Sequence, residues 1–254
     1  MKINLQGKKY LITSGCSFTD GFNMRERGSW AYYLSNLLNL ELRNKARGGS
    51  GNEYISDSII IELMNFPEII NESVVGIAWS DISRLMTPIY ENKCNVLDTI
   101  QPHDFLDCDN NKSKYVNSKD AQKFFSDIPF CVYKTYMAIT KLNHFLDSYN
   151  IPYFYIDAIN PTQIKNVGNY KFILYGHTNS QMEFYFDQWP HQYLWVLNDM
   201  FNKSIFKNFL KIGEHSSILD FMFTDYEKYE KGNPGHPNDI ASEEIAKIIY
   251  NQII

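Results

Sequence analysis

A turn of small residues, directly after an apolar run near the start of the chain, constrains the fold most. The run is Tyr10 to Ile12, and the turn extends from Ser14 to Gly21 with Ser17 near its centre. In α/β proteins a strand that ends in such a turn exposes a hydroxyl at the carboxyl edge of a parallel sheet, where ligands bind. Serine and glycine after a strand also form ordinary turns. The rest of the chain decides between these two interpretations.

Apolar, β-branched segments alternate with segments of helical spacing over the first third of the chain. Strands are expected at 10–13, 40–44, 73–79 and 153–157, and helices at about 29–38, 53–65, 121–149, 191–201 and 240–252. Ser29 is placed to cap the first helix and Pro129 to break the third. This order predicts a three-layer α/β/α sandwich around a mostly parallel sheet of about five strands.

Residues 1–254 are predicted to form one domain with two insertions. The composition is 44% hydrophobic, enough for a sizeable core. The strand–helix order breaks at about 86–120, which is polar and looks irregular, and again at about 160–190. Long insertions of this kind in compact domains are usually functional loops or lids.

Charge and cysteine usage exclude several classes of partner. The net charge is −5 and no basic stripe is present, so no nucleic-acid partner is expected. No apolar run is long enough to span a bilayer, and the first nine residues have no signal-peptide pattern, so we expect no membrane partner. The four cysteines are far apart, which favours free thiols in the cytoplasm and leaves two disulfides as the alternative. The oligomeric state is not predicted.

Four short blocks, each after an expected strand or before a helix, form an ordered set. They are Gly15–Thr19, the pair Asn44 and Gly49, Ala78–Asp81, and Asn233–Asn238. In order and context this set resembles the SGNH (GDSL-type) hydrolase family, whose SGNH/flavodoxin-like fold agrees with the predicted sandwich. The resemblance covers about 10–78 and 232–254, and leaves both insertions uncovered.

The resemblance implies a role for each matching residue. Ser17 would be the nucleophile, His236 the base, and Asn233 would occupy the position of the residue that orients the base. The oxyanion hole would comprise the backbone N–H groups of Ser17 and Gly49, with Ser80 as a third donor.

The chain departs from the family pattern in three places. Cys16 stands where aspartate is usual, Ser80 where asparagine donates, and Asn233 where a carboxylate is usual. Asparagine can orient a neutral imidazole but brings no charge to stabilise the imidazolium. Nearby carboxylates could replace it, and the candidates are Asp20, Asp81, Asp157 and Asp239, of which Asp239 could instead cap the last helix.

The implied activity is serine-dependent hydrolysis of a small ester. We expect removal of a small acyl group, such as acetyl, from a carbohydrate or another small molecule. Candidates for contact with the substrate are Asp20, Asn52, Trp79, Asp81 and Arg84. Two alternatives stay open: transfer of the acyl group to another alcohol, and a non-catalytic binding or structural relative that keeps the scaffold.

Rival chemistries have weaker support in the sequence. Cys16 is a second nucleophile beside Ser17, and the glycines at 48–51 could cradle a phosphate, although the P-loop ending is missing. The calcium-like start at Asp107 fails because Lys112 and Ser118 replace the required Gly and Glu. The histidines at 103, 144, 177, 191 and 215 show no metal-binding spacing, so neither a metal nor a cofactor is expected.

Overall fold

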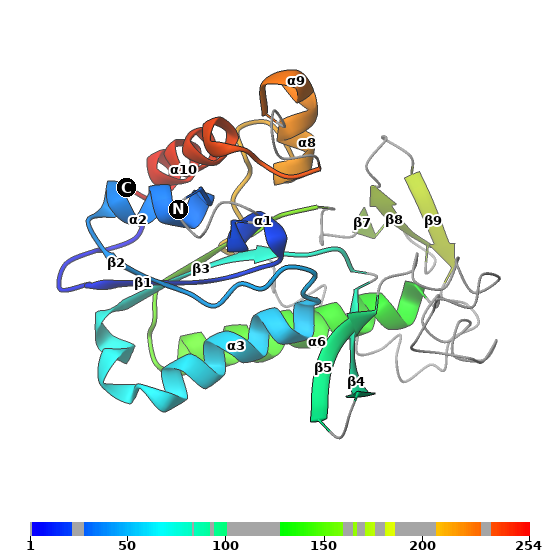
Figure 1. Cartoon of the computed structure of the whole chain (residues 1–254), viewed down its shortest axis with the longest axis horizontal. Coiled ribbons are helices and arrows are strands. Elements are labelled where there is room, and N and C mark those ends of the chain that lie inside the picture. The colour runs from blue at the N-terminus through cyan, green and yellow to red at the C-terminus, as the bar shows by residue number, and fades with distance from the viewer. Residues whose placement is uncertain are drawn as a thin grey trace.

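A parallel sheet with helices on both faces forms the centre of the molecule (Figure 1). This computed structural model describes residues 2–21, 28–82, 84–91, 94–100, 128–159, 165–166, 171–175, 181–185, 207–229 and 235–254. The sheet order is β2-β1-β3-β6, formed by Glu41–Asn44, Tyr10–Ser14, Ser73–Trp79 and Tyr153–Asp157, with every pairing parallel. The predicted strands are therefore confirmed to within one residue at each end.

The sheet has four strands rather than about five. At its β6 edge, the N–H of Tyr155 donates to the Asn208 carbonyl (2.9 Å) and the N–H of Leu210 donates to the Tyr155 carbonyl (2.8 Å). These bonds form a single parallel bridge between Tyr155 and Phe209. One bridge does not make a strand, so the expected fifth position is filled by a short bonded segment.

Two pairs of helices cover the sheet, as predicted. Helices α2 (Trp30–Leu38) and α10 (Asp239–Ile253) lie together on one face, and α3 (Asn52–Asn65) and α6 (Ile128–Ser148) on the other (Figure 1). Alternate residues of the central strands enter the two cores: Ile77 and Trp79 face α3 and α6, whereas Ala78 faces α2 and α10. Strand β3 is buried along its whole length, as its apolar run requires.

Local signals explain most of the helix ends. The hydroxyl of Ser29 accepts a hydrogen bond from the N–H of Tyr32 (3.4 Å) and so caps α2, as predicted. Helix α6 is described from Ile128, so Pro129 stands in its first turn, where the missing N–H costs little, and the residues before it lie outside the described part. The short helices α1 (Ser17–Asp20), η1 (Pro67–Glu72), α8 (Ile218–Met222), η3 (Phe223–Asp225) and α9 (Tyr226–Tyr229) complete the described helical structure.

Both predicted insertions contain antiparallel strands. Strands β4 (Leu85–Glu91) and β5 (Cys94–Ile100) form a hairpin in a stretch expected to be irregular, so that expectation is wrong for these residues. Strands β7 (Lys165–Asn166), β8 (Lys171–Tyr175) and β9 (Gln181–Tyr185) form a second small sheet. The helix expected at about 191–201 lies outside the described residues.

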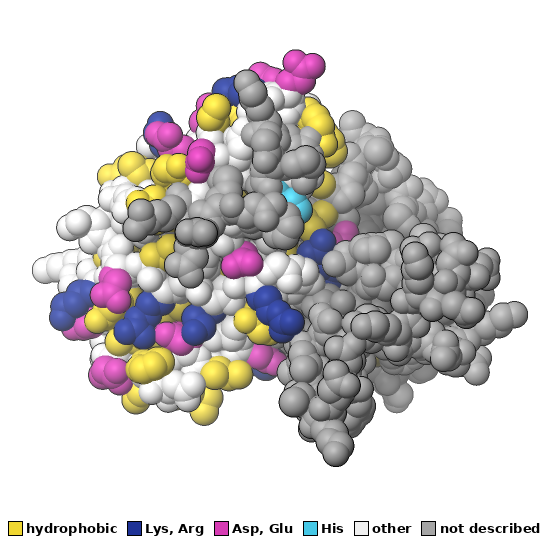
Figure 2. Space-filling view, viewed as in Figure 1, with side chains coloured by type: hydrophobic (Ala, Val, Ile, Leu, Met, Phe, Trp, Pro, Cys, Tyr) yellow, Lys and Arg dark blue, Asp and Glu magenta, His cyan; other side chains and the backbone are white. Residues whose placement is uncertain are grey.

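Surface charge, apolar length and possible metal ligands add three observations on the described residues. Acidic and basic side chains are interspersed over the described part of the face in Figure 2. Over the same residues, no helix combines the length and apolarity needed to cross a bilayer, and no group of three His, Cys, Asp or Glu side chains is arranged to hold a metal ion.

Candidate active site

The turn after β1 places Ser17 at the first position of α1, where its side chain is 8% exposed. Gly15 makes this turn possible, because a Cβ there would lie 2.7 Å from the Cβ of Thr19 and closer still to its hydroxyl oxygen. That hydroxyl cannot easily move away, since it accepts a hydrogen bond from the indole N–H of Trp30 (3.1 Å). The chain is therefore forced to turn sharply just before Ser17.

His236 meets Ser17 across 219 residues of sequence. Its Nε2 lies 2.9 Å from the Ser17 hydroxyl oxygen, and its ring lies 5.5 Å from the ring of Phe18 at an angle of 48°. In the tautomer that carries its proton on Nδ1, Nε2 accepts the serine hydroxyl hydrogen. This is the contact that a serine nucleophile needs with its base.

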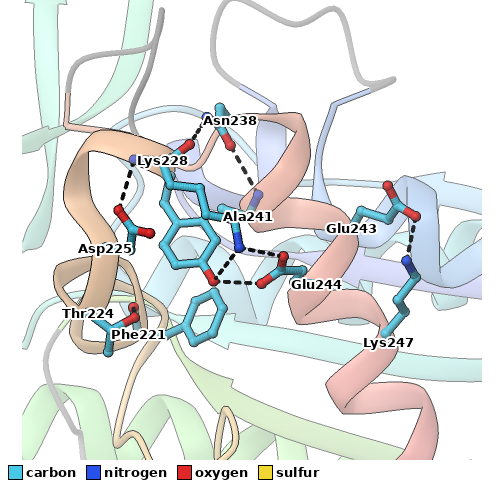
Figure 3. A network of polar contacts seen from close by, with 10 residues as sticks. Phe221, Thr224, Asp225, Lys228, Asn238, Ala241, Glu243, Glu244 and Lys247 are labelled. Atoms are coloured by element: carbon cyan, nitrogen blue, oxygen red, sulfur yellow. Dashed lines mark hydrogen bonds and ion pairs between the residues drawn. The ribbon is translucent and has the colours of Figure 1, made fainter.

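Asn238 fixes the segment that carries His236. Its side-chain oxygen accepts from the N–H of Ala241 (3.0 Å) and caps α10, and its amide nitrogen donates to the Lys228 carbonyl (2.7 Å), as Figure 3 shows. Its backbone N–H donates to the carbonyl of Tyr229 (2.9 Å). Two residues from the base, the chain is thus bonded to both α9 and α10.

A charged group on the surface joins the same two helices. The Lys228 ammonium donates to Glu244 (2.9 Å), and the Tyr229 hydroxyl donates to the other oxygen of that carboxylate (2.6 Å). Burial and the adjacent carboxylate raise the pKa of Tyr229, so the hydroxyl keeps its proton at neutral pH. These contacts hold α9 against α10 behind the Asn238 cap.

The glycine loop before α3 lies against Ser17. A Cβ on Gly48 would come within 3.9 Å of the Ser17 Cβ and 3.6 Å of an Asp20 carboxylate oxygen. The N–H of Gly48 donates to Asp20 (3.1 Å), and the N–H of Arg47 donates to the carbonyl of Gly15 (3.2 Å). Asp20 therefore anchors the loop beside the nucleophile.

Gly49 occupies the one position of this loop that needs a glycine. The N–H of Ser50 donates to the Arg47 carbonyl (3.1 Å), which closes a tight turn, and Gly49 has φ of +78° at its third position. Its N–H makes no hydrogen bond to any residue that the structure describes. That donor is therefore not used within the described part of the chain.

Asn44 ties the end of β2 to the nucleophile turn. Its side-chain oxygen accepts from the Thr13 hydroxyl (3.0 Å) and the Ala46 N–H (3.1 Å), and its amide donates to the carbonyl of Thr19 (2.8 Å). The Asn44 side chain thus supports the nucleophile turn. In the sequence, Asn44 was singled out only by its spacing to Gly49.

Ser80 follows the end of β3, the strand that neighbours β1. Strands β1 and β3 are hydrogen-bonded neighbours with Ser14 opposite Ile77, so Ser17 and Ser80 each stand three residues beyond that pair. Neighbouring strands are about 4.8 Å apart. Ser80 itself is fully buried.

Asn52, the first residue of α3, forms hydrogen bonds with the backbone of Ser80. Its side-chain oxygen accepts the Ser80 N–H (2.8 Å), and its amide donates to the Ser80 carbonyl (3.2 Å) and to the Thr135 hydroxyl of α6 (3.0 Å). The Ser80 hydroxyl oxygen accepts from Nη1 of Arg84 (3.1 Å). The segment that follows β3 is thus held by a polar network, and the Arg84 guanidinium stands at one end of that network.

Trp79 does not reach this site. Its side chain is fully buried and packs edge-on against Tyr155, with ring centroids 5.4 Å apart, in the core beneath α3 and α6. The expected contact with substrate is therefore wrong, because strand alternation turns residue 79 to the opposite face from Ala78. Cys16 is also buried, in the α2–α10 core, whereas its neighbour Ser17 meets the histidine.

The candidate orienting residues lie in different places. Asp239 accepts a hydrogen bond from the hydroxyl of Tyr33 (3.0 Å); burial and this carboxylate raise the pKa of Tyr33 to about 12. Asn238, rather than Asp239, caps α10. Asp81 follows Ser80 and its carbonyl accepts from the N–H of Arg84 (3.2 Å), and Asp157 is buried at the end of β6. Asn233 lies outside the described residues.

Sequence reasoning gave Gly48 and Asn238 no role at the site. Asn238 carries the usual cap signal, a short polar residue just before a periodic apolar helix. Gly48 has no comparable signal, because contact between its backbone and Ser17 depends on how the loop folds back over α1.

Comparison with known proteins gives likenesses in structure alone. No family profile matches the sequence, and no curated protein matches it. The chain is similar to the psychrotrophic esterase EstA from Pseudoalteromonas sp., at 10% identity over 96% of each chain and a TM-score of 0.49. It is similar to TesA at 9% identity over 96% of this chain and 97% of the other, with a TM-score of 0.46. An acetyl xylan esterase, AlAXEase, is 17% identical over 96% of this chain and all of its own, with a TM-score of 0.38.

Proposed function

We propose that this protein is a serine-dependent ester hydrolase of the SGNH type. The observation that carries the proposal is the 2.9 Å contact between Nε2 of His236 and the Ser17 hydroxyl, at the carboxyl edge of a parallel sheet. A histidine ring placed on a serine at a glycine-bounded turn has the geometry of an activated nucleophile.

The reaction has two halves. The Ser17 oxygen attacks the ester carbonyl carbon while His236 takes its proton, and the collapse of the tetrahedral intermediate expels the alcohol with that proton. Water, deprotonated by His236, then attacks the acyl-serine and releases the acid. We assign the oxyanion hole to the N–H groups of Ser17 and Gly49, and each such donor typically lowers the barrier by about 3 kcal/mol.

The orientation of the His236 ring depends on a hydrogen bond from its other nitrogen, Nδ1. With Nε2 on Ser17, Nδ1 carries the proton and needs an acceptor. We assign this role to the side-chain carbonyl of Asn233. It fixes the tautomer without adding negative charge, so we expect a slower enzyme than one with a carboxylate there.

The proposed substrate is an ester with a small acyl group, such as acetyl, on a carbohydrate or another small alcohol. Ser17 is 8% exposed and is closely flanked by Gly48 and the His236–Phe18 ring pair, which favours a short acyl chain. If a second alcohol replaces water, the same residues transfer the acyl group.

Turnover of 4-nitrophenyl acetate and of an acetylated sugar tests this proposal. We expect Ser17→Ala to lower kcat/KM by at least about a thousandfold and to abolish labelling by a fluorophosphonate probe. Ser56→Ala is the matched control, because Ser56 is a buried serine whose hydroxyl oxygen makes no hydrogen bond to the residues that the structure describes. Cys16→Ser tests the rival nucleophile and should retain activity. Equal inactivity of wild type and Ser17→Ala on both substrates, with no labelling, would leave the non-catalytic alternative.

A further inference from the structure

Arg84 is a half-buried cation without a carboxylate partner among the described residues. Its Nη1 donates to the Ser80 hydroxyl oxygen (3.1 Å), and no described Asp or Glu forms an ion pair with it. Arg43 shows the contrast, since its guanidinium pairs with Glu62 at 3.0 Å. Holding an unpaired charge partly out of water is unfavourable, so a ligand that supplies the opposite charge would be favoured there.

The anchor of the guanidinium follows the strand that neighbours the nucleophile turn. Strands β1 and β3 pair with each other, a Cβ on Gly15 in that turn would lie 3.1 Å from the carbonyl oxygen of Ala78, and Arg84 is one hydrogen bond from Ser80. Asn52 holds the Ser80 backbone from both sides, so the anchor of the guanidinium is fixed. The bond to Ser80 engages Nη1 and leaves the Nη2 edge for the paired hydrogen bonds that arginine makes with a carboxylate.

The two flanks of Ser17 differ in charge. On the β2 side, the Asp20 carboxylate lies against Gly48, while Asn44 of β2 bonds to the turn next to it. On the β3 side, Arg84 presents the positive charge. A substrate that carries an anionic group would therefore place that group towards β3, with its ester carbonyl over Ser17.

We propose that Arg84 selects esters that carry a carboxylate, in the acyl or in the alcohol part, close to the scissile bond. This inference rests on the proposed function and adds the chemical class of its substrate. The carboxylate accepts two hydrogen bonds from the guanidinium, which fixes the ester relative to Ser17 and His236.

Matched pairs of esters test the inference. One pair is 4-nitrophenyl hemiglutarate and 4-nitrophenyl butyrate, with or without an acyl-side carboxylate. The other is 4-acetoxybenzoate and its methyl ester, which places the charge in the alcohol part. We expect the wild type to prefer the charged member of at least one pair by tenfold or more in kcat/KM, mainly through KM. The pair that shows the preference identifies the side.

Substitutions then assign that preference to one residue. Arg84→Gln should reduce the charged-to-neutral ratio to about one, and Arg84→Lys should keep part of it. Lys247→Gln removes the same charge from an exposed site on α10 paired with Glu243, and should leave the ratio unchanged. If Arg84→Gln fails to fold, inhibition of wild-type 4-nitrophenyl acetate turnover by glutarate, and not by glutaramide, still decides the point.

Two failures are distinguishable. A wild type that hydrolyses charged and neutral esters equally, without inhibition by glutarate, overturns the inference while the serine hydrolase stands. A ratio that survives in Arg84→Gln also overturns it. Loss of the proposed function itself would appear earlier, as a Ser17→Ala variant with unchanged rates.

Discussion

The two faces of the central sheet use their polar residues differently. On the α3–α6 face, Glu62 accepts from Arg43 (3.0 Å) and Lys45 (2.9 Å), and the Arg43 guanidinium lies over the rings of Tyr10 and Phe66 at 4.9 and 5.1 Å. These contacts join β2 to α3 and touch no residue of the candidate site. On this face, polar contacts hold the layers together.

On the α2–α10 face, the polar contacts hold the candidate catalytic pair. Ser17 stands just after the short turn that ends buried strand β1, whereas His236 depends on the Asn238 cap and on the α9–α10 contacts behind it. The difference teaches that contacts that join layers and contacts that position the catalytic pair should affect different quantities. Substitutions in the Arg43–Glu62–Lys45 group should lower stability alone, whereas those that position His236 should lower activity as well.

His236→Ala should have the largest effect. Without the base, the Ser17 hydroxyl keeps its proton, so we expect kcat/KM on 4-nitrophenyl acetate to fall by about a thousandfold or more. The side chain is partly exposed, so the midpoint of thermal unfolding should change little. A variant that keeps more than a tenth of the wild-type rate would contradict the assigned role.

Gly15→Ala should have the second-largest effect, and it should lower both stability and kcat. The added Cβ would collide with Thr19 and move α1, so we expect a loss of about 2 kcal/mol in stability and at least a hundredfold in kcat. Gly76→Ala is the matched control, because its Cβ would meet the ring of Phe154 in the core at 2.5 Å. It should lower stability to a similar degree and leave kcat nearly unchanged once the protein is folded.

Asn238→Ala should lower both stability and activity, because Asn238 caps a helix close to the base. Loss of the cap costs about 1 kcal/mol, and the freed segment should also lower kcat about tenfold, because His236 is only two residues away. Ser29→Ala removes the corresponding cap of α2 and should cost a similar amount of stability with unchanged kcat. Chemical denaturation and steady-state kinetics on both variants check this; equal kcat values would contradict a role for Asn238 in positioning His236.

Glu62→Gln should have the smallest effect, confined to stability. Burial raises the pKa of Glu62, but its bonds to Lys45 and Arg43 outweigh this and lower it overall. The ion pairs therefore stabilise the protein above the unfolded pKa of about 4.3, and this contribution is lost as pH falls through the lower folded pKa. Because both partners are partly exposed, we expect about 1 kcal/mol at neutral pH. Unfolding followed from pH 7 to pH 3 should show a smaller loss for Glu62→Gln than for wild type, with kcat unaffected.

The buried strands could be predicted because their signal is local. Strands β3 and β6 have the bounds expected from their apolar runs, since both are covered on each face. The hairpin at 85–100 was missed because its apolar residues neither alternate regularly with polar ones nor form one continuous run, and Pro88 interrupts the first strand.

The positions of the candidate site residues could be predicted from the sequence better than the contacts between them. The resemblance of the ordered blocks to the SGNH family pointed to Ser17, Gly49 and His236, and the structure brings Ser17 and His236 together. The bond from Arg84 to Ser80 depends on a turn of four residues, and the burial of Trp79 depends on which face the strand presents at its last residue. Neither this hydrogen bond nor the burial of Trp79 can be read from the spacing of the motifs in the sequence.

The separation of Ser17 and His236 by 219 residues has a consequence for synthesis on the ribosome. At roughly 5–20 residues per second, the nucleophile turn emerges many seconds before the histidine is made. Helix α10 packs beside α2, and the carbonyl of Ile253 accepts the N–H of Ile3 (2.8 Å), so the last segment completes a layer begun by the first. A nascent chain that lacks His236 and α10 therefore carries an unactivated serine, and the proposed esterase activity should arise only after α10 has been made.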